Sequence, residues 1–314
     1  MTKIITPIFL VGAERSGTTL LRLMLDHHPK MAFNYEFEYA VNQIDLNGNW
    51  PDLPAYYDYL STNRIFLNTH FTVDHNFDYP TLLNSFLQQK RQRDNKPLVG
   101  ATVHHQFHHL IKIWPEAKFI HLLRDGRDVA RSNILMGWAG NLFTGVDRWI
   151  TAEQLWQQLS TQLAAEQHCT VRYEDLIQNP ERELSQICDF IGIPFNQGMF
   201  DYVKTSTYSF PDSSIVERWR KQLTEYEIQL AESKIAPLLT ERGYPLSGLP
   251  LLKNTVGLRW RLYLHSRWKQ HLFRIRRYGF GLYLQDMLSR RLHLKNWQKQ
   301  VRRDINACDS QHLK

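Results

Sequence analysis

Short apolar runs alternate with helical patterns along most of the chain. Residues Ile4 to Val11 form a β-rich run, which predicts a buried strand. The next segment, Thr18 to His28, has leucines and Met24 at helical spacing and is followed by Pro29, which predicts a helix. A second apolar run, Lys118 to Leu123, predicts another buried strand, and a turn and a helix follow it. The order of strand, loop and helix therefore occurs twice.

Further helices and a third strand complete this pattern. Residues 104–113 and residues 153–167 are predicted helices, and residues 169–173 (CTVRY) are a predicted short strand. A helix follows, opened by Asn179 and closed by Gly192. Strands that alternate with helices predict an α/β fold, in which helices flank a central parallel sheet like that of phosphate-binding-loop proteins.

The composition indicates a full hydrophobic core and a basic C-terminal end. The chain has 314 residues, of which 43% are hydrophobic, which allows one large or two ordinary domains. Residues 251–314 contain 15 Lys or Arg and 3 Asp or Glu and carry a net charge of +12, whereas residues 1–250 carry −5. We therefore predict an α/β domain over residues 1–248 and a basic helical extension over residues 249–314.

The extension has an amphipathic pattern with aromatic residues on its apolar side. One face carries Trp260, Leu264, Trp268, Leu272 and Ile275, and the other carries Arg259, Arg267, Arg274 and Arg277. This pattern is typical of a helix that binds an anionic membrane surface through residues 251–314. A helical subdomain packed on the rest of the chain would show the same pattern. Nucleic acid is not an expected partner, because no nucleic-acid-binding module accompanies the charge.

The location that the sequence predicts is the cytoplasm, with peripheral membrane attachment as an option. The first ten residues are too short for a signal peptide, and no apolar run approaches the length of a membrane span. Three scattered cysteines fit a reducing compartment.

The loop after the first strand resembles a phosphate-binding loop in which the lysine is missing. Gly12 and Gly17 have the spacing of the G-x-x-x-x-G-K-[ST] loop, but Thr18 stands at the lysine position and Thr19 follows. Such a loop still offers backbone N–H groups and a helix N-terminus to an anion, and Arg15 adds a positive charge. A plain structural turn is the alternative interpretation.

A second anion site is predicted where the strand Lys118–Leu123 ends. Arg124 follows this strand, and Ser132 lies eight residues further on. Ligands of open α/β sheets bind at the carboxyl ends of strands, so this arginine and serine suit a second phosphate. A solvated turn with an Arg124–Asp125 pair is the alternative.

Together the two motifs, GAERSGTTLLRLMLDHHP and KFIHLLRDGRDVARS, resemble the sulfotransferases that use 3′-phosphoadenylyl sulfate (PAPS), in particular the tyrosylprotein and carbohydrate branches. The resemblance extends over residues 5–246. It implies that the first loop, with Gly12, Arg15, Ser16, Gly17, Thr18 and Thr19, binds the 5′-phosphosulfate of PAPS. It also implies that Arg124 and Ser132 bind the 3′-phosphate, and that transfer needs no metal.

The resemblance also implies residues for the chemistry. Glu36 stands where the tyrosylprotein branch has its general base, and Glu38 is the alternative base. Many members carry a lysine that stabilises the leaving group, but Ala101 stands at that position here. His104 or His105 would then supply the missing donor or act as the base, and we favour His104. Arg15 would stabilise charge on the leaving phosphate.

A metal site is the rival interpretation of the histidines, because two pairs, His104/His108 and His105/His109, have i, i+4 spacing. The sequence shows no clear third ligand. Three contacts to the donor are also implied by the resemblance: Tyr173 to adenine, Ser214 or its neighbour Ser213 to the 5′ end, and Arg220 with Lys221 to the 3′-phosphate.

The predicted function is in-line transfer of a sulfonate from PAPS to an acceptor hydroxyl. The acceptor, which is a sugar, a tyrosine, a lipid or a small molecule, is not identified, because the aromatic segment 31–90 that sets this choice shows no pattern that identifies one. Within it, residues 31–79 have weak periodicity and are predicted as short helices and long loops. Two alternatives remain: a kinase with a degenerate loop, and a non-catalytic nucleotide-binding scaffold at a membrane.

Overall fold

The computed structural model describes residues 4–45 and 47–312, which form two compact units. The first unit comprises Met1–Val129 and Arg148–Lys221, and the second comprises Ala130–Asp147 and Gln222–Lys314. The domain boundary between residues 248 and 249 stays a prediction. Residues 1–3, 46, 313 and 314 of the two predicted domains lie outside the described residues.

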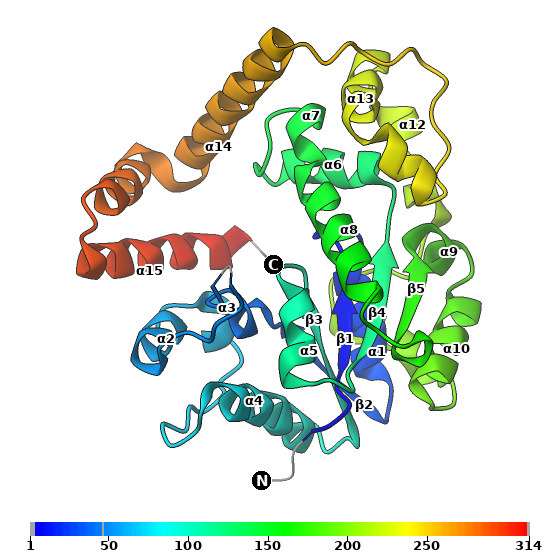
Figure 1. Cartoon of the computed structure of the whole chain (residues 1–314), viewed down its shortest axis with the longest axis vertical. Coiled ribbons are helices and arrows are strands. Elements are labelled where there is room, and N and C mark those ends of the chain that lie inside the picture. Colours follow the sequence, from blue (N-terminus) through cyan, green and yellow to red (C-terminus); the bar gives the residue numbers. More distant parts are fainter. Residues whose placement is uncertain (1–3, 46, 313–314) are drawn as a thin grey trace. The chain divides into compact units, whose positions relative to one another are not determined.

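The first unit is built around a five-stranded sheet in the order β2-β3-β1-β4-β5 (Figure 1). All four pairings between neighbouring strands are parallel, and β1 lies at the centre. The strands are β1 (Ile8–Val11), β2 (Met31–Glu36), β3 (Leu98–Val103), β4 (Lys118–Leu123) and β5 (His168–Arg172). Parallel strands end at a common edge, so the segments that follow them are brought together.

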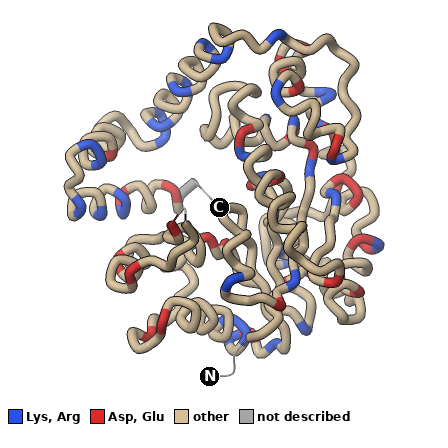
Figure 2. The backbone as a smooth tube through the Cα atoms, viewed as in Figure 1, with Lys and Arg blue, Asp and Glu red and all other residues tan. Residues whose placement is uncertain are grey.

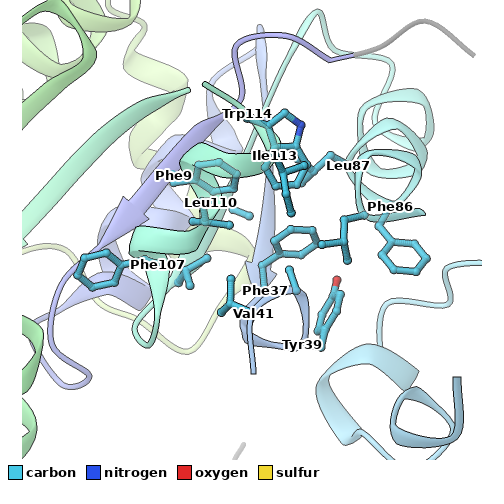
Figure 3. Close-up of a cluster of buried hydrophobic side chains, with 14 of the residues drawn as sticks. Phe9, Phe37, Tyr39, Val41, Phe86, Leu87, Phe107, Leu110, Ile113 and Trp114 are labelled. Atoms are coloured by element: carbon cyan, nitrogen blue, oxygen red, sulfur yellow. The ribbon is translucent and has the colours of Figure 1, made fainter. Parts of the chain in front are cut away.

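Side chains of β1 alternate between two hydrophobic clusters, one on each face of the sheet. Phe9 and Val11 belong to the cluster that contains Phe37 and Trp114, which Figure 3 shows. Ile8 and Leu10 belong to the other cluster. All four residues of β1 are buried, which explains why the strand is apolar throughout.

Helices of the first unit cover both faces of this sheet. Apolar residues of α4 (Tyr79–Arg93), α5 (Leu110–Ile113) and α8 (Asp147–Ser160) belong to the first cluster. The second cluster receives residues of α1 (Thr18–His27), α9 (Tyr173–Gln178), α10 (Pro180–Ile191) and α11 (Tyr202–Thr205). The remaining elements are α2 (Leu53–Leu60), α3 (Arg64–Leu67), α6 (Gly126–Leu135), α12 (Arg218–Gln222) and the 3₁₀ turns η1 (Glu38–Ala40), η2 (Phe107–His109), η3 (Ala165–Gln167), η4 (Gln197–Phe200) and η5 (Ser213–Ile215). The predicted helix-flanked parallel sheet is confirmed.

Two parts of the predicted secondary structure are wrong. The start of the segment 31–79 is not loop or helix but strand β2, and four of its six residues are buried. The predicted helix 104–113 is only a 3₁₀ turn and the short α5, because Gln106 has a left-handed backbone (φ 48°) that ends any helix running through it. The histidines at 104 and 105 therefore lie before the helical turns.

The second unit contains α7 (Leu142–Gly145), α13 (Glu225–Glu241), α14 (Val256–Arg291) and α15 (Lys295–His312). The capping box of Thr224 and Glu227 begins α13. In α14, Gly279 has a non-helical backbone, which kinks this long helix. The predicted basic helical extension is thus present as α14 and α15. In the described part of the chain, no helix has the length and apolarity needed to cross a lipid bilayer.

Candidate active site

Five connections meet at the carboxyl edge of the sheet, and they bring most of the predicted site residues with them. The glycine loop follows β1, Arg124 follows β4, and Tyr173 follows β5. Glu36 ends β2, and His104 is the residue directly after β3. Because β1 pairs with both β3 and β4, the loop lies between the segments that carry His104 and Arg124.

The glycine loop has the conformation of an anion cradle. Gly12 has φ 144°, and a Cβ there would lie 2.5 Å from the Leu122 carbonyl oxygen of β4. Gly17 has φ 97° and precedes the first residue of α1, so the helix N-terminus opens on the loop. The hydroxyl of Ser16 is buried and has no hydrogen-bond partner in the described chain. A buried polar group of this kind fits a site that an anionic ligand completes.

Arg124 joins the loop to the tip of β5. Its Nη1 donates to the Arg15 carbonyl oxygen at 3.2 Å, and its guanidinium lies 4.1 Å from the centre of the Tyr173 ring. The same ring fills the space beside Gly17, where an added Cβ would lie 2.3 Å from it. The loop, Arg124 and Tyr173 thus form one continuous surface. The Nε of Arg124 is buried without a partner in the described chain, which leaves a charged donor for a ligand.

Three side chains form a hydrogen-bonded chain between the loop and β2. Thr18 Oγ1 lies 2.9 Å from His104 Nε2, and His104 Nδ1 lies 2.6 Å from Glu38 Oε1. The backbone N–H of His104 also donates to Glu38 Oε1 at 3.0 Å. Burial lowers the pKa of His104, but the Glu38 carboxylate outweighs that effect, so the pKa is raised above its ordinary value. The geometry thus favours an imidazolium at the end of the phosphate loop.

Both carboxylates of this edge, Glu36 and Glu38, have an oxygen without a hydrogen-bond partner in the described chain, but only Glu38 is also bonded to His104. Glu36 lies at the end of β2, opposite Thr102 of β3, and its carboxylate makes no hydrogen bond within the described residues. Burial raises the pKa of Glu36, and the nearby charge of Glu38 raises it further. A carboxylate with these properties is a stronger base than an exposed one. Glu38, by contrast, is buried and bonded to His104.

Sequence analysis missed a carboxylate within the glycine loop itself. Glu14 forms an ion pair with Arg148 and lies 3.3 Å from His105. Burial raises the pKa of Glu14, but His105 and Arg148 outweigh it and hold the pKa at about 2. Arg148 therefore fixes one side of the loop. A carboxylate within an anion-binding loop indicates that a cation lies beside it, but the sequence does not identify that cation as Arg148, 134 residues away.

The acidic residues that follow β4 do not form a metal site. Asp125 is buried and accepts from Arg127 Nε at 3.0 Å and from Arg127 Nη2 at 2.7 Å. Asp128 accepts from the backbone N–H of Trp219 at 2.8 Å. Burial raises the pKa of Asp128 to about 6, although the charge of Arg124 acts in the opposite direction. Within the described residues, no three His, Cys, Asp or Glu side chains are grouped to hold a metal ion.

The structure separates the predicted histidine pairs. His104 lies before the turn at Gln106 and points to Glu38, whereas His108 lies in η2 and contacts His109, with ring centres 3.9 Å apart. The two histidines of a pair therefore do not share a helix face, as the zinc interpretation required. Ala101 lies within β3 and belongs to the buried cluster of Figure 3, so its side chain is part of the core and not of the edge.

The described interactions of three other predicted contact residues, Ser214, Arg220 and Lys221, do not place them at this edge, and a fourth, Ser132, belongs to the second unit. Ser214 is exposed and bonds to Asp212, and Arg220 is exposed and forms an ion pair with Glu217 at 3.0 Å. Lys221 is also exposed, and Ser132 lies in the part of α6 that belongs to the second unit. Their roles stay predictions. Arg218, which was not predicted, is close enough to Tyr173 for its charge to act on the pKa of that phenol.

The first unit thus has the α/β fold of proteins that bind a phosphorylated ligand at the carboxyl edge of a parallel sheet, with a cradle built from a glycine loop. A family model described as "Sulfotransferase family" matches residues 7–197. The chain therefore belongs to the sulfotransferase family, as its resemblance predicted, and sulfonate transfer is the activity of its class.

Relatives and solved structures agree with this family. The chain is 24% identical over 274 residues to protein-tyrosine sulfotransferase A of Caenorhabditis elegans, an alignment that covers 77% of this chain and 68% of that protein. It is 25% identical over 265 residues to protein-tyrosine sulfotransferase 1 of Danio rerio, covering 76% and 72%. The structure of the sulfotransferase domain from the curacin biosynthetic pathway is similar, with a TM-score of 0.52 at 20% identity, covering 78% of this chain and all of that one.

Proposed function

We propose that this protein transfers a sulfonate from PAPS to an acceptor hydroxyl. The observation that supports this proposal is the continuous surface of the glycine loop, Arg124 and Tyr173, in which Arg124 bonds to the loop and stacks on the ring. An adenylate with phosphates at both ends presents two anionic groups and one aromatic base, which match the loop, Arg124 and Tyr173 in chemistry. The loop would hold the 5′-phosphosulfate and Arg124 the 3′-phosphate, and Tyr173 would contact the adenine.

The orphaned polar atoms of the site support binding of such a doubly anionic donor. Ser16 Oγ and Arg124 Nε are both buried without partners in the described chain, and phosphate oxygens would satisfy them. Backbone N–H groups of the loop and the N-terminus of α1 add further donors for the 5′ end. This donor set requires no metal ion.

The reaction is a substitution at sulfur. The acceptor oxygen attacks the sulfur, the bond from sulfur to the bridging phosphate oxygen breaks, and adenosine 3′,5′-bisphosphate leaves with the electron pair. The proton of the acceptor hydroxyl goes to Glu36, whose raised pKa and lack of a partner in the described chain support this role. Glu38 is less suited, because its Oε1 already accepts two hydrogen bonds from His104.

His104 would stabilise the leaving phosphate in place of the lysine that many relatives have. A cationic His104 donates from Nδ1 to Glu38 and from Nε2 to Thr18 Oγ1. The Thr18 hydroxyl then has its own proton free to donate to the bridging or non-bridging phosphate oxygen. Charge that develops on the leaving group would thus be met by a preorganised donor that is supported by an imidazolium.

The kinase alternative is less well supported than sulfonate transfer. A Mg²⁺-dependent kinase needs a carboxylate near the end of the strand beside the loop. Asp125 is the first carboxylate after β4, but the guanidinium of the buried Arg127 occupies both of its oxygens. A non-catalytic scaffold would bind adenosine 3′,5′-bisphosphate but would transfer nothing.

The decisive experiment is a transfer assay with sulfur-labelled PAPS and a panel of acceptors. Tyrosine peptides come first, because the relatives named above are protein-tyrosine sulfotransferases, and sugars, lipids and small phenols follow. Transfer with release of adenosine 3′,5′-bisphosphate in the presence of EDTA supports the proposal. Binding of that nucleotide without transfer to any acceptor would favour the scaffold. Mg²⁺-dependent binding of ATP, without affinity for the bisphosphate, would favour the kinase. The cytoplasmic location stays a prediction.

A further inference from the structure

Helix α14 presents large apolar side chains to solvent along one face. Val256, Trp260, Tyr263, Leu264 and Trp268 have exposed fractions of 64%, 65%, 42%, 62% and 56%. Their spacing of three or four residues places them on one side of the helix, which we call the aromatic stripe. Five neighbouring exposed side chains of this size are unusual on a soluble surface and mark an interaction site.

The opposite face of α14 is packed within the second unit, which fixes the direction of the stripe. Leu262 and Ser266 are buried. Asn141 Nδ2 donates to the Leu262 carbonyl oxygen at 2.8 Å, and the Gly140 backbone N–H donates to Ser266 Oγ at 2.9 Å. One side of the helix is therefore held by the segment before α7. At the edge of the stripe, Tyr263 contacts Phe143 of α7 and accepts a hydrogen bond from Lys234 of α13 at 3.3 Å. The outward part of the stripe is formed by the other four side chains.

The charge around the stripe has only one sign. Residues 243–285 contain eight Lys or Arg and no Asp or Glu. Figure 2 shows several blue segments along α14. Arg259 and Arg267 line a hollow of about 590 Å³ together with Val256, Trp260, Tyr263 and Leu264. Within the described part of the second unit, neither arginine forms an ion pair. Their charges are therefore available to an anionic partner.

We propose that the aromatic stripe and its arginines bind the surface of an anionic lipid bilayer. Trp and Tyr side chains favour the boundary between headgroups and acyl chains, because one end of each ring is polar and the rest is apolar. Arginines beside them reach the phosphates of the headgroups while their methylene groups lie along the apolar layer. The hollow has apolar walls and two guanidinium groups, so it suits a single lipid with an anionic headgroup.

Other partners fit the stripe less well. A nucleic acid would bind the arginines but would leave Val256 and Leu264 in water. A second copy of the chain would bring two surfaces of the same positive sign together, which is unfavourable. A bilayer satisfies both the apolar and the cationic groups at once.

The test is flotation of the full chain with phosphatidylcholine vesicles, with and without added phosphatidylserine. We expect binding to the anionic vesicles that weakens with salt. The variant R259A/R267A should weaken it about 10–30-fold, and W260A/W268A by about tenfold or more. Arg182→Ala and Leu135→Ala, at exposed positions of α10 and α6, are matched controls and should bind as the unaltered chain does.

A second readout separates membrane contact from a general loss of folding. Brominated lipids should quench the fluorescence of the bound protein, and W260F/W268F should reduce this quenching. Each variant should retain its affinity for adenosine 3′,5′-bisphosphate, which tests the active site independently. Equal binding to neutral vesicles, no binding at all, or unchanged binding of both double variants would overturn the proposal. So would loss of self-association or of DNA binding in W260A/W268A without any vesicle binding.

Discussion

The assignment of Glu36 as general base makes a prediction that distinguishes it from its neighbour Glu38. Replacement of Glu36 by Gln keeps the shape of the side chain and removes the proton acceptor. Because the Glu36 carboxylate has no hydrogen-bond partner within the described residues, this change breaks no side-chain hydrogen bond and should leave the fold intact. General-base catalysis contributes about 10²–10⁴-fold, so we expect kcat to fall by that factor, or about 3–5 kcal/mol in activation free energy.

The matched variant Glu38→Gln should behave differently. It removes the negative charge of Glu38, whose Oε1 lies 2.6 Å from His104 Nδ1, so the pKa of His104 should fall. A hydrogen bond between charged groups contributes about 1.5–3 kcal/mol, so part of this should appear as lower stability and part as weaker binding of adenosine 3′,5′-bisphosphate. Glu36→Gln should leave that binding unchanged.

The assay is sulfonate transfer to the acceptor identified in the panel, measured between pH 5 and pH 9, with calorimetry of the bisphosphate alongside. A general base must be deprotonated, so activity should fall as the pH is lowered through the raised pKa of Glu36. In the Glu36→Gln variant, the pH–activity profile should no longer show this fall at low pH, its acidic limb. If Glu36→Gln retains full turnover, or if Glu38→Gln alone removes the acidic limb while bisphosphate binding is unchanged, the assignment of the base is refuted.

Three further changes test the rest of the site. Arg124→Ala should weaken binding of adenosine 3′,5′-bisphosphate by about 1.5–3 kcal/mol, because it removes a charged donor, and unchanged affinity in calorimetry would contradict the second anion site. Asp128→Asn should stabilise the protein by about 1–3 kcal/mol above pH 7 and not near pH 4. The pKa of Asp128 is about 6 in the folded state and 3.8 ordinarily, so the wild-type protein loses stability as the pH rises through this range. Denaturant unfolding at both pH values checks this. Gly17→Ala should abolish bisphosphate binding, because its Cβ would lie 2.3 Å from the Tyr173 ring, whereas Gly192→Ala, which has a similar φ of 91° and open space, should cost stability only.

The elements that the sequence predicts well are those with strong local signals. Strand β1 is a continuous apolar run and β4 is largely apolar, both lie next to glycine- or arginine-containing turns, and α10 has a clear cap at Gly192. Strands β2 and β3 were missed because MAFNYE and LVGATV gain their stability from pairing with each other and with β1. A local pattern does not report such pairing.

The site residues also divide into those with a local sequence motif and those that depend on long-range contacts. The glycine loop and Arg124 were predicted from motifs, and the structure joins them by a hydrogen bond. The ion pair of Glu14 with Arg148 joins positions 134 residues apart, and no spacing rule predicts it. The contact of His104 with Glu38 joins positions 66 residues apart, and it depends on the strand pairing of β2 with β3 and on the turn at Gln106, which the sequence analysis did not predict.

The connections between the strands of the parallel sheet have different proposed roles. Residues after β1, β3, β4 and β5 are proposed to hold the donor or its leaving group, and Glu38 of η1 supports His104. The connection that follows η1, through α2 and α3 to α4, provides no donor group in this proposal. That connection is therefore a module that selection can exchange without loss of nucleotide affinity. A chimera that receives the equivalent connection from a relative should change its acceptor preference and keep its affinity for the same donor.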